Sequence, residues 1–215
     1  MTGKPSIPPS PASPSAPHAA ASSLGNSLNV ASPLPEDKGQ LRKRMLAERR
    51  AIDPRDKASW DDAIGARLLS LLDKTERRDW GVYWPLKGEP DLMAAYPLLA
   101  ERGVRLYLPV VVERDAPLAF AAWTPGEGMH KDSMGIAVPE SLRLGSQPNL
   151  LLIPCLGWNK DKYRLGYGGG FYDRTLAQPE PPLTVGVGYA CMEADFSAEA
   201  HDVALDMMIT ERNSW

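Results

Sequence analysis

The chain of 215 residues is 43% hydrophobic and carries a formal net charge of −3 at pH 7. This length suits one α/β domain with a tail, and the slightly acidic balance argues against a nucleic-acid-binding protein, which is usually strongly basic. No apolar run approaches the roughly 18 residues expected of a membrane-spanning helix, and the first residues lack the features of a signal or transit peptide.

The cysteines and histidines indicate a reducing compartment and no zinc site. Cys155 and Cys191 are the only cysteines and form no C-x-x-C motif, so a secreted disulfide framework is not expected. The histidines are scattered and do not have the spacing of zinc ligands. We therefore expect a cytoplasmic monomer that binds a small molecule and has neither a nucleic-acid nor a membrane partner.

Residues 1–35 are rich in proline, serine and alanine and almost free of charged and aromatic residues. Such a segment buries too little apolar surface to offset the entropy lost when it becomes ordered, so we predict a disordered tail. The folded domain is expected over residues 36–215.

Two helices are predicted at the start of this domain. In residues 36–52 the apolar residues recur at helical spacing, and Asp53-Pro54 ends the helix because the residue before proline disfavours the α conformation. Lys38 and Arg42 stand four residues apart and therefore share a face, which on pattern alone is most simply a solvated face. A second helix is predicted over residues 57–73.

A strand over residues 80–84 and a helix over residues 91–102 form the next unit. Asp91 is a suitable N-cap, Gly103 is a suitable closing residue, and Pro97 should kink the helix. Trp84 and Glu89 lie at the carboxyl end of the strand, where open α/β sheets bind ligands. A glutamate in an exposed loop is nevertheless most often only solvated.

Further strands complete an alternating pattern. They are expected at residues 104–112 with an interruption at Pro109, at 118–123, and at 183–189 with breaks at its glycines. Alternating strands and helices imply a mostly parallel sheet with helices on both faces.

Residues 150–174 hold the strongest functional signal. Leu150 to Ile153 form an apolar run that ends at Pro154, as in a strand buried on both faces. Residues 164–170 follow with four glycines among the last five positions, which lets the backbone adopt φ > 0 and bring N–H groups close to a ligand. A helix predicted over residues 171–177 would direct its positive end toward the same point, which favours an anion such as phosphate.

The charged residues of this stretch strengthen the prediction. Arg164 supplies a forked cation, and Asp173 supplies a hard oxygen ligand for Mg²⁺. A glycine-rich surface turn is the simpler alternative, because neither G-x-x-x-x-G-K-[ST] nor G-x-G-x-x-G is present: Phe171 occupies the position of the last glycine. The combination of buried strand, arginine, glycine cluster and acid favours an anion site beside a metal ligand.

The segment Arg164-Leu165-Gly166-Tyr167-Gly168-Gly169-Gly170-Phe171-Tyr172-Asp173-Arg174 resembles the signature of the 5-formyltetrahydrofolate cyclo-ligase family, also called methenyltetrahydrofolate synthetases. The resemblance extends over residues 36–210. It implies a three-layer α/β/α sandwich and an enzyme that closes 5-formyltetrahydrofolate to 5,10-methenyltetrahydrofolate, with ATP and Mg²⁺, releasing ADP and phosphate.

The resemblance also implies a role for each matching residue. Arg164 and Tyr172 would act in catalysis, and Asp173 and Asp202 would hold Mg²⁺. The implied nucleotide site comprises Lys38, Arg42, Arg164, Leu165, Gly166, Tyr167, Gly168, Gly169, Gly170, Phe171 and Tyr172. The implied folate site comprises Trp84, Glu89, Tyr167, Gly168, Gly169, Gly170 and Phe171. Without the resemblance, Asp202 is most simply a solvated turn residue.

Three positions depart from the family pattern. Asn159 stands where the family usually has an aspartate, Lys162 replaces a glycine, and Met192 lies where a glutamine is expected. A left-handed turn at Lys162 would cost on the order of 1 kcal/mol. These departures keep open an alternative in which the chain is a diverged, non-catalytic homologue that binds a nucleotide or phosphorylated ligand as a sensor or partner protein.

Overall fold

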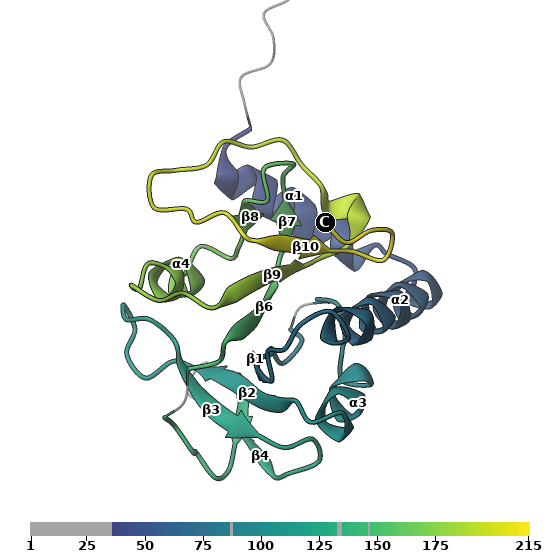
Figure 1. Ribbon diagram of the computed structural model, residues 1–215. Helices are drawn as coiled ribbons and strands as arrows, with labels where there is room; N and C mark the ends of the chain where they lie inside the picture. Colours follow the sequence, from purple (N-terminus) through teal and green to yellow (C-terminus); the bar gives the residue numbers. More distant parts are fainter. Residues whose placement is uncertain (1–35, 87, 133–134, 146) are drawn as a thin grey trace, which may run out of the picture. The chain divides into compact units, whose positions relative to one another are not determined.

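The computed structural model describes residues 36–86, 88–132, 135–145 and 147–215, so the predicted tail of residues 1–35 lies outside the described residues. Within this part of the chain, six strands form a mixed sheet in the order β10-β9-β6-β1-β2-β3 (Figure 1). Neighbouring strands are parallel except for the antiparallel pair of β2 and β3. The strands are β1 (Asp79–Gly81), β2 (Arg105–Val110), β3 (Ala119–Trp123), β6 (Leu150–Pro154), β9 (Leu183–Val187) and β10 (Met207–Ile209).

Strand β6 is buried on both faces, as its apolar run predicts. Leu150 and Leu152 belong to one core cluster, and Leu151 and Ile153 belong to the cluster on the opposite face. Alternation of side chains along a strand directs successive leucines to opposite faces, so an unbroken apolar run fills two cores. Both neighbours of β6, β1 and β9, are parallel to it.

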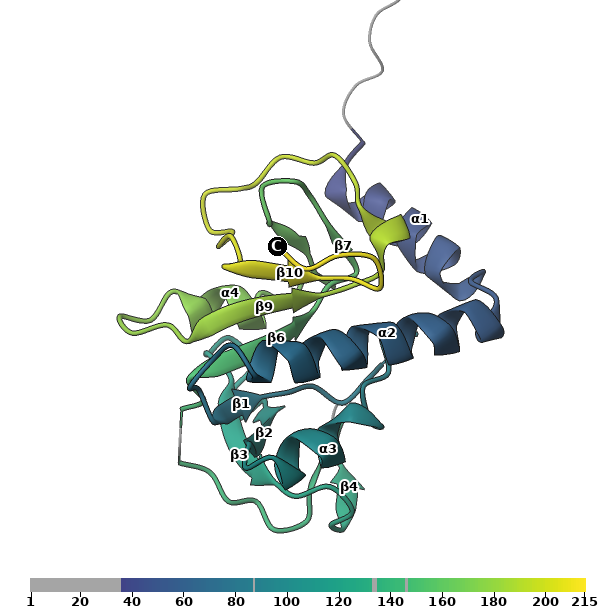
Figure 2. The ribbon, with the colours of Figure 1, turned by 45° about the vertical axis from the view of Figure 1, so that its right-hand side comes forward.

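Helices cover both faces of the sheet (Figure 2), as the predicted three-layer sandwich requires. Helices α1 (Lys38–Arg50), α2 (Pro54–Leu72) and α3 (Ala95–Glu101) contribute to the first cluster, and α4 (Phe171–Leu176) contributes Leu176 to the second. Asp53 lies outside the α conformation, as predicted, and α1 has ended by Arg50. The second helix begins three residues earlier than predicted: the Asp53 side chain caps α2, and Pro54 occupies its first turn. Among the described residues, none of the helices is long and apolar enough to cross a membrane.

Two short hairpins extend from the main sheet. One pairs β4 (Met129–Lys131) with β5 (Ala137–Pro139), and the other pairs β7 (Gly157–Trp158) with β8 (Arg164–Leu165). A 3-10 turn, η1 (Ala190–Met192), follows β9. The β7–β8 hairpin matters for function because it carries the chain from β6 to the glycine cluster.

The predicted helix over residues 91–102 begins later than expected. Asp91 accepts a hydrogen bond from the Met93 N–H at 3.0 Å, but α3 starts only at Ala95. Pro97 therefore lies in the first turn, where its missing N–H removes no helical hydrogen bond, and the predicted kink has no basis. Gly103 closes the helix with a φ of +85°, as predicted.

The predicted interruptions at Pro109 and Gly186 are wrong. Pro109 lies beyond the part of β2 that pairs with β1, so its lack of an N–H removes no bond to that neighbour. Gly186 continues β9, where it pairs with Ile153 of β6 and Met208 of β10. A larger residue would not fit, because a Cβ there would stand 2.5 Å from Leu205 Cδ1 and 2.6 Å from Met208 Sδ. The glycine is thus a packing requirement within the strand.

Candidate active site

A pocket of about 690 Å³ opens where the carboxyl ends of β1, β2 and β6 meet. The chain passes from β1 to β2 on one side and returns to β6 on the other, and ligands of open α/β sheets bind at such a reversal of strand order. All of the predicted site residues line this pocket: Lys38, Arg42, Trp84, Glu89, residues 164–173 and Asp202. Their individual ligand roles remain predictions.

Residues 166–170, here called the glycine cluster, connect β8 to α4. Gly168 and Gly170 have φ values of +89° and +66°, in the left-handed region that glycine adopts without strain. Gly170 is also the N-cap of α4, and a Cβ there would stand 2.7 Å from Arg174 Nη1. The bare backbone of the cluster therefore faces the pocket, as the sequence predicts.

Helix α1 holds this cluster from the side. Arg42 Nε donates a hydrogen bond of 2.9 Å to the Gly166 carbonyl. Lys38 Nζ lies 2.7 Å from Asp202 Oδ2 and 3.0 Å from Glu199 Oε1. Burial alone would lower the pKa of Lys38, but these two carboxylates outweigh it and raise that pKa. The interpretation of Lys38 and Arg42 as a merely solvated face is wrong.

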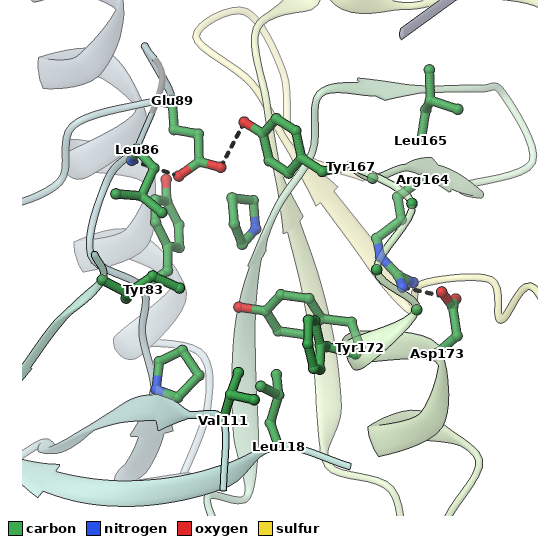
Figure 3. Close-up of a pocket in the computed structure, with 18 of the residues that line it drawn as sticks. Tyr83, Leu86, Glu89, Val111, Leu118, Arg164, Leu165, Tyr167, Tyr172 and Asp173 are labelled. Atoms are coloured by element: carbon green, nitrogen blue, oxygen red, sulfur yellow. Dashed lines mark hydrogen bonds and ion pairs between the residues drawn. The ribbon is translucent and has the colours of Figure 1, made fainter. Parts of the chain in front are cut away.

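Arg164 lies at the end of the pocket nearest α4 (Figure 3). Its guanidinium contacts Asp173 at 2.7 Å, and the Arg164 and Asp173 side chains are only 6% and 18% exposed. Within the described residues, Arg164 Nη1 is buried without a hydrogen-bond partner. A buried N–H edge that no protein group uses is suited to an anionic ligand.

The Tyr172 side chain occupies the middle of the pocket. It extends from α4 into the space between Glu89 and Val111 (Figure 3), and Arg164 lies over its ring at 5.7 Å from the centroid. Burial raises the pKa of Tyr172 well above its ordinary value, so its hydroxyl stays neutral at neutral pH. A neutral phenol beside a cation can orient a ligand through a hydrogen bond.

Asp173 and Asp202 are the two predicted metal ligands, and both line the pocket. Burial tends to raise the pKa of Asp202, but Lys38 more than offsets this, so the pKa is lowered and the carboxylate is ionised. The described residues contain no group of three histidine, cysteine or carboxylate side chains arranged to hold a metal. Two carboxylates nevertheless fit Mg²⁺, which takes one or two from the protein and completes its shell with water and phosphate oxygens.

Glu89 lies across the pocket from Arg164 and is buried, with 4% exposure. Its Oε2 accepts a hydrogen bond from the Leu86 N–H at 2.8 Å, and its Oε1 accepts one from the Tyr167 hydroxyl at 2.9 Å (Figure 3). The interpretation of Glu89 as a solvated loop residue is therefore wrong. Trp84 stacks edge-to-face on Trp123 beside it, with ring centroids 6.1 Å apart.

Several lining residues escaped sequence reasoning. Val111 and Leu118 form an apolar wall, and their positions at strand ends were a usable signal. Glu199 and His201 lie in an irregular segment that has no comparable pattern. Arg49 also escaped notice, because nothing in a basic helix distinguishes a buried arginine from its solvated neighbours.

The three departures from the family pattern lie outside the described lining of the pocket. Lys162 adopts a φ of +63°, so the left-handed turn exists and carries the predicted strain. Asn159 Oδ1 accepts hydrogen bonds from the Asp161 and Tyr163 N–H groups at 3.1 and 2.9 Å, which stabilises that turn. Met192 is buried, with 2% exposure. These residues shape the β7–β8 hairpin and its surroundings.

Comparison with known proteins identifies close counterparts of this architecture. Two curated 5-formyltetrahydrofolate cyclo-ligases are each 30% identical to this chain: that of Mycoplasma pneumoniae, covering 81% of this chain and 99% of the relative, and that of Mycolicibacterium smegmatis, covering 83% and 95%. The solved 5,10-methenyltetrahydrofolate synthetase of Mycoplasma pneumoniae superposes with a TM-score of 0.66 at 29% identity, covering 82% of this chain and 99% of that one. The NMR structure of the Aquifex aeolicus synthetase gives 0.71 at 26% identity, covering 82% and 91%.

The family profile matches nearly the whole described part of the chain. The match extends over residues 35–211, which includes all six strands of the described sheet and every predicted site residue. On this match and the 30% identical relatives, the chain belongs to the 5-formyltetrahydrofolate cyclo-ligase family.

Proposed function

We propose that this protein converts 5-formyltetrahydrofolate to 5,10-methenyltetrahydrofolate and consumes ATP, with release of ADP and phosphate. The observation that carries the proposal is the presence, in one pocket, of a nearly buried guanidinium at Arg164 and a buried carboxylate at Glu89. Family membership indicates the reaction. The positively charged end of the pocket would bind the nucleotide, and the end with the Glu89 carboxylate would bind the folate.

The reaction requires activation because the formyl oxygen is a poor leaving group. Transfer of the γ-phosphoryl group onto this oxygen breaks the bond to ADP and forms an imidoyl phosphate. The neighbouring folate nitrogen then attacks the activated carbon and loses its proton, and phosphate leaves with the former formyl oxygen. The protein therefore has to position two substrates and neutralise charge, and it needs no nucleophile of its own.

The phosphate groups would lie between the glycine cluster and the cations. Arg164 would donate its unused Nη1 edge, while Arg42, fixed on the Gly166 carbonyl, and Lys38 add positive charge. Backbone N–H groups of residues 166–170 complete the cradle. Charge-assisted hydrogen bonds of this kind are about twice as strong as neutral ones, so the site favours a polyphosphate.

The folate would occupy the opposite end of the pocket. Glu89 accepts hydrogen bonds only, so it would face the N–H groups of a folate ring. Trp84 and the wall of Val111 and Leu118 offer apolar contact, and Tyr172 lies between the two ends. This arrangement would bring the formyl oxygen toward the phosphate site.

The metal assignment is part of the proposal. Asp173 and Asp202 would hold Mg²⁺, which when bound neutralises phosphate charge. Asp173 already pairs with Arg164, and Asp202 pairs with Lys38. A bound metal would therefore lie beside these two cations and contact the same carboxylates. The protein groups alone set the position of the phosphates in this scheme.

We also propose that the enzyme is a cytoplasmic monomer without nucleic-acid or membrane partners. Its two cysteines, Cys155 and Cys191, are free, which agrees with a reducing compartment. The net charge of −3 gives no electrostatic reason to bind nucleic acid. Size-exclusion chromatography with light scattering tests the monomer.

A coupled assay tests the proposed activity. Purified protein is mixed with 5-formyltetrahydrofolate, ATP and Mg²⁺, and the methenyl-folate absorbance is followed, with controls that omit ATP or add a chelator. Product that forms only in the complete mixture supports the proposal. Binding of ATP without any product would instead favour the non-catalytic homologue.

A further inference from the structure

Three segments that are distant in sequence meet at the folate end of the pocket. Arg49, on the last turn of α1, donates through Nη2 to the Tyr167 hydroxyl, and that hydroxyl donates to Glu89 Oε1 at 2.9 Å. The contacts join residues 118 and 78 positions apart along the chain. Tyr167 belongs to the glycine cluster, so the chain of hydrogen bonds links this cluster to the Glu89 loop.

The direction of each hydrogen bond is fixed by chemistry. A guanidinium has no acceptor, so Tyr167 must accept from Arg49 and has its single proton left for Glu89. Glu89 Oε1 accepts that proton, which completes the sequence from guanidinium to phenol to carboxyl group. Rotation of the Tyr167 hydroxyl away from Glu89 would break the hydrogen bond between them.

The two ends of this network are shielded from water. Arg49 is 3% exposed and Glu89 is 4% exposed, whereas Tyr167 is 39% exposed and lines the pocket. Arg49 also packs under Gly88, whose Cβ position would lie 4.0 Å from Arg49 Nε. The Leu86 N–H holds the other carboxylate oxygen at 2.8 Å. Glu89 is thus held from two sides, one of which moves with the glycine cluster.

We propose that Arg49 and Tyr167 are positioning residues that set the orientation of the Glu89 carboxylate for the folate. The role of Tyr167 lies in its hydroxyl group, in addition to any contact that its backbone makes. Arg49 does not itself line the pocket, but it contacts the pocket through the Tyr167 hydroxyl. This inference rests on the proposed function, since it assigns Glu89 to the folate.

The network also ties the two substrate sites together. Helix α1 contacts the glycine cluster twice, through Arg42 on the Gly166 carbonyl and through Arg49 on the Tyr167 hydroxyl. A shift of the cluster toward bound phosphate therefore moves the hydroxyl that orients Glu89. Folate affinity should depend on the bound nucleotide as long as the Tyr167 hydroxyl is present.

The test removes that hydroxyl alone with Tyr167→Phe. We expect the KM for 5-formyltetrahydrofolate to rise about tenfold, the cost of one hydrogen bond to a charged group, with kcat and the KM for ATP changed far less. In a Glu89→Ala background, where no acceptor is left, the same substitution should change the folate KM less than about twofold, because the two residues act as a unit. Arg49→Lys keeps a hydrogen-bond donor, so its folate KM should stay close to the wild-type value, whereas Arg49→Met should raise the folate KM.

Tyr107→Phe is the matched control. Tyr107 also donates to a carboxylate, Asp79 Oδ1 at 3.0 Å, and does not line the pocket, so its loss should leave both KM values unchanged. Thermal melting of every variant separates loss of fold from loss of positioning. Direct titration of 5-formyltetrahydrofolate, with and without a non-hydrolysable ATP analogue, measures the coupling between the sites.

The outcomes separate this inference from the proposed function. Absence of product with the wild-type protein would overturn the proposed function. Wild-type turnover with an unchanged folate KM in Tyr167→Phe, or with equal effects in both Glu89 backgrounds, would overturn the positioning role alone. A lower folate KM in Tyr167→Phe would also overturn it, since the hydroxyl would then compete with the folate for Glu89.

Discussion

Asp173→Asn separates a metal ligand from a simple ion-pair partner. Asparagine keeps the shape of the side chain and one acceptor for Arg164, but it removes the charge from a pair whose side chains are 18% and 6% exposed. Exchanging a charged for a neutral hydrogen bond should cost about 1–2 kcal/mol, less than the roughly 3–5 kcal/mol for deleting one partner of a buried pair. For a domain of this size the melting temperature should fall by about 2–8 °C.

The catalytic effect should be larger than the loss of stability. If Asp173 holds Mg²⁺, the variant should need at least about tenfold more Mg²⁺ for half-maximal turnover, because one of at most two protein carboxylates is lost. Binding of ATP without metal should be no weaker, since Arg164 is then released from its carboxylate. Turnover measured against Mg²⁺ at saturating ATP, and calorimetry of ATP in chelator, test these points.

A matched control is Asp62→Asn, which removes an exposed carboxylate from α2. It should alter neither the melting temperature nor the Mg²⁺ dependence. If Asp173→Asn lowers the melting temperature and leaves the Mg²⁺ dependence at the wild-type value, Asp173 only pairs with Arg164, and the metal assignment is refuted.

Three further predictions follow from single contacts. Arg164→Ala should weaken ATP binding by roughly 10- to 100-fold, and Glu89→Ala should weaken mainly folate binding. Calorimetric titration of each ligand against each variant measures both affinities. Equal losses of affinity for both ligands in both variants would show that the ends of the pocket are misassigned. Lys162→Gly should stabilise the protein by up to about 1 kcal/mol, because glycine adopts the φ of +63° without strain, whereas Lys160→Gly should not. The midpoints of urea unfolding of the two variants test this, and an unchanged midpoint for Lys162→Gly would show that Lys162 is not strained. Pairing with Arg105 lowers the pKa of Asp79 below its ordinary 3.8, so the ionised form stabilises above that value and the contribution disappears as pH falls through the lowered pKa. Asp79→Asn should therefore destabilise the fold near neutral pH and progressively less in acid. Urea unfolding measures this, and a free energy of unfolding that is lower than the wild-type value by the same amount at every pH would contradict the prediction.

Local patterns predicted the part of the fold on which the site is built. The apolar run from Leu150 to Ile153 predicted a buried strand because burial on both faces requires such a run. The glycine cluster predicted backbone with positive φ, and Gly168 and Gly170 adopt it. The start of α3 and the continuation of β2 through Pro109 depended on tertiary packing that outweighs local preference.

The polar architecture of the pocket could not be read in the same way. Glu89 stands in a loop and Arg49 in a basic helix, and each has an unremarkable local sequence. Both are buried and hydrogen-bond to Tyr167, which is 78 and 118 residues away, respectively. No periodicity encodes such a contact. Family resemblance located Glu89 because it carries tertiary information, but it did not reveal the hydrogen-bond partners of the carboxylate.

The strand order has a consequence for synthesis on the ribosome. Strand β1 pairs with β2 on one edge and with β6 on the other, yet β6 begins at Leu150, long after β1 ends at Gly81. At about 5–20 residues per second, the β6-facing edge of β1 waits several seconds for its neighbour. An open edge of buried, apolar strand is a template for association with other chains, so a nascent-chain chaperone or slow, dilute refolding should raise the yield.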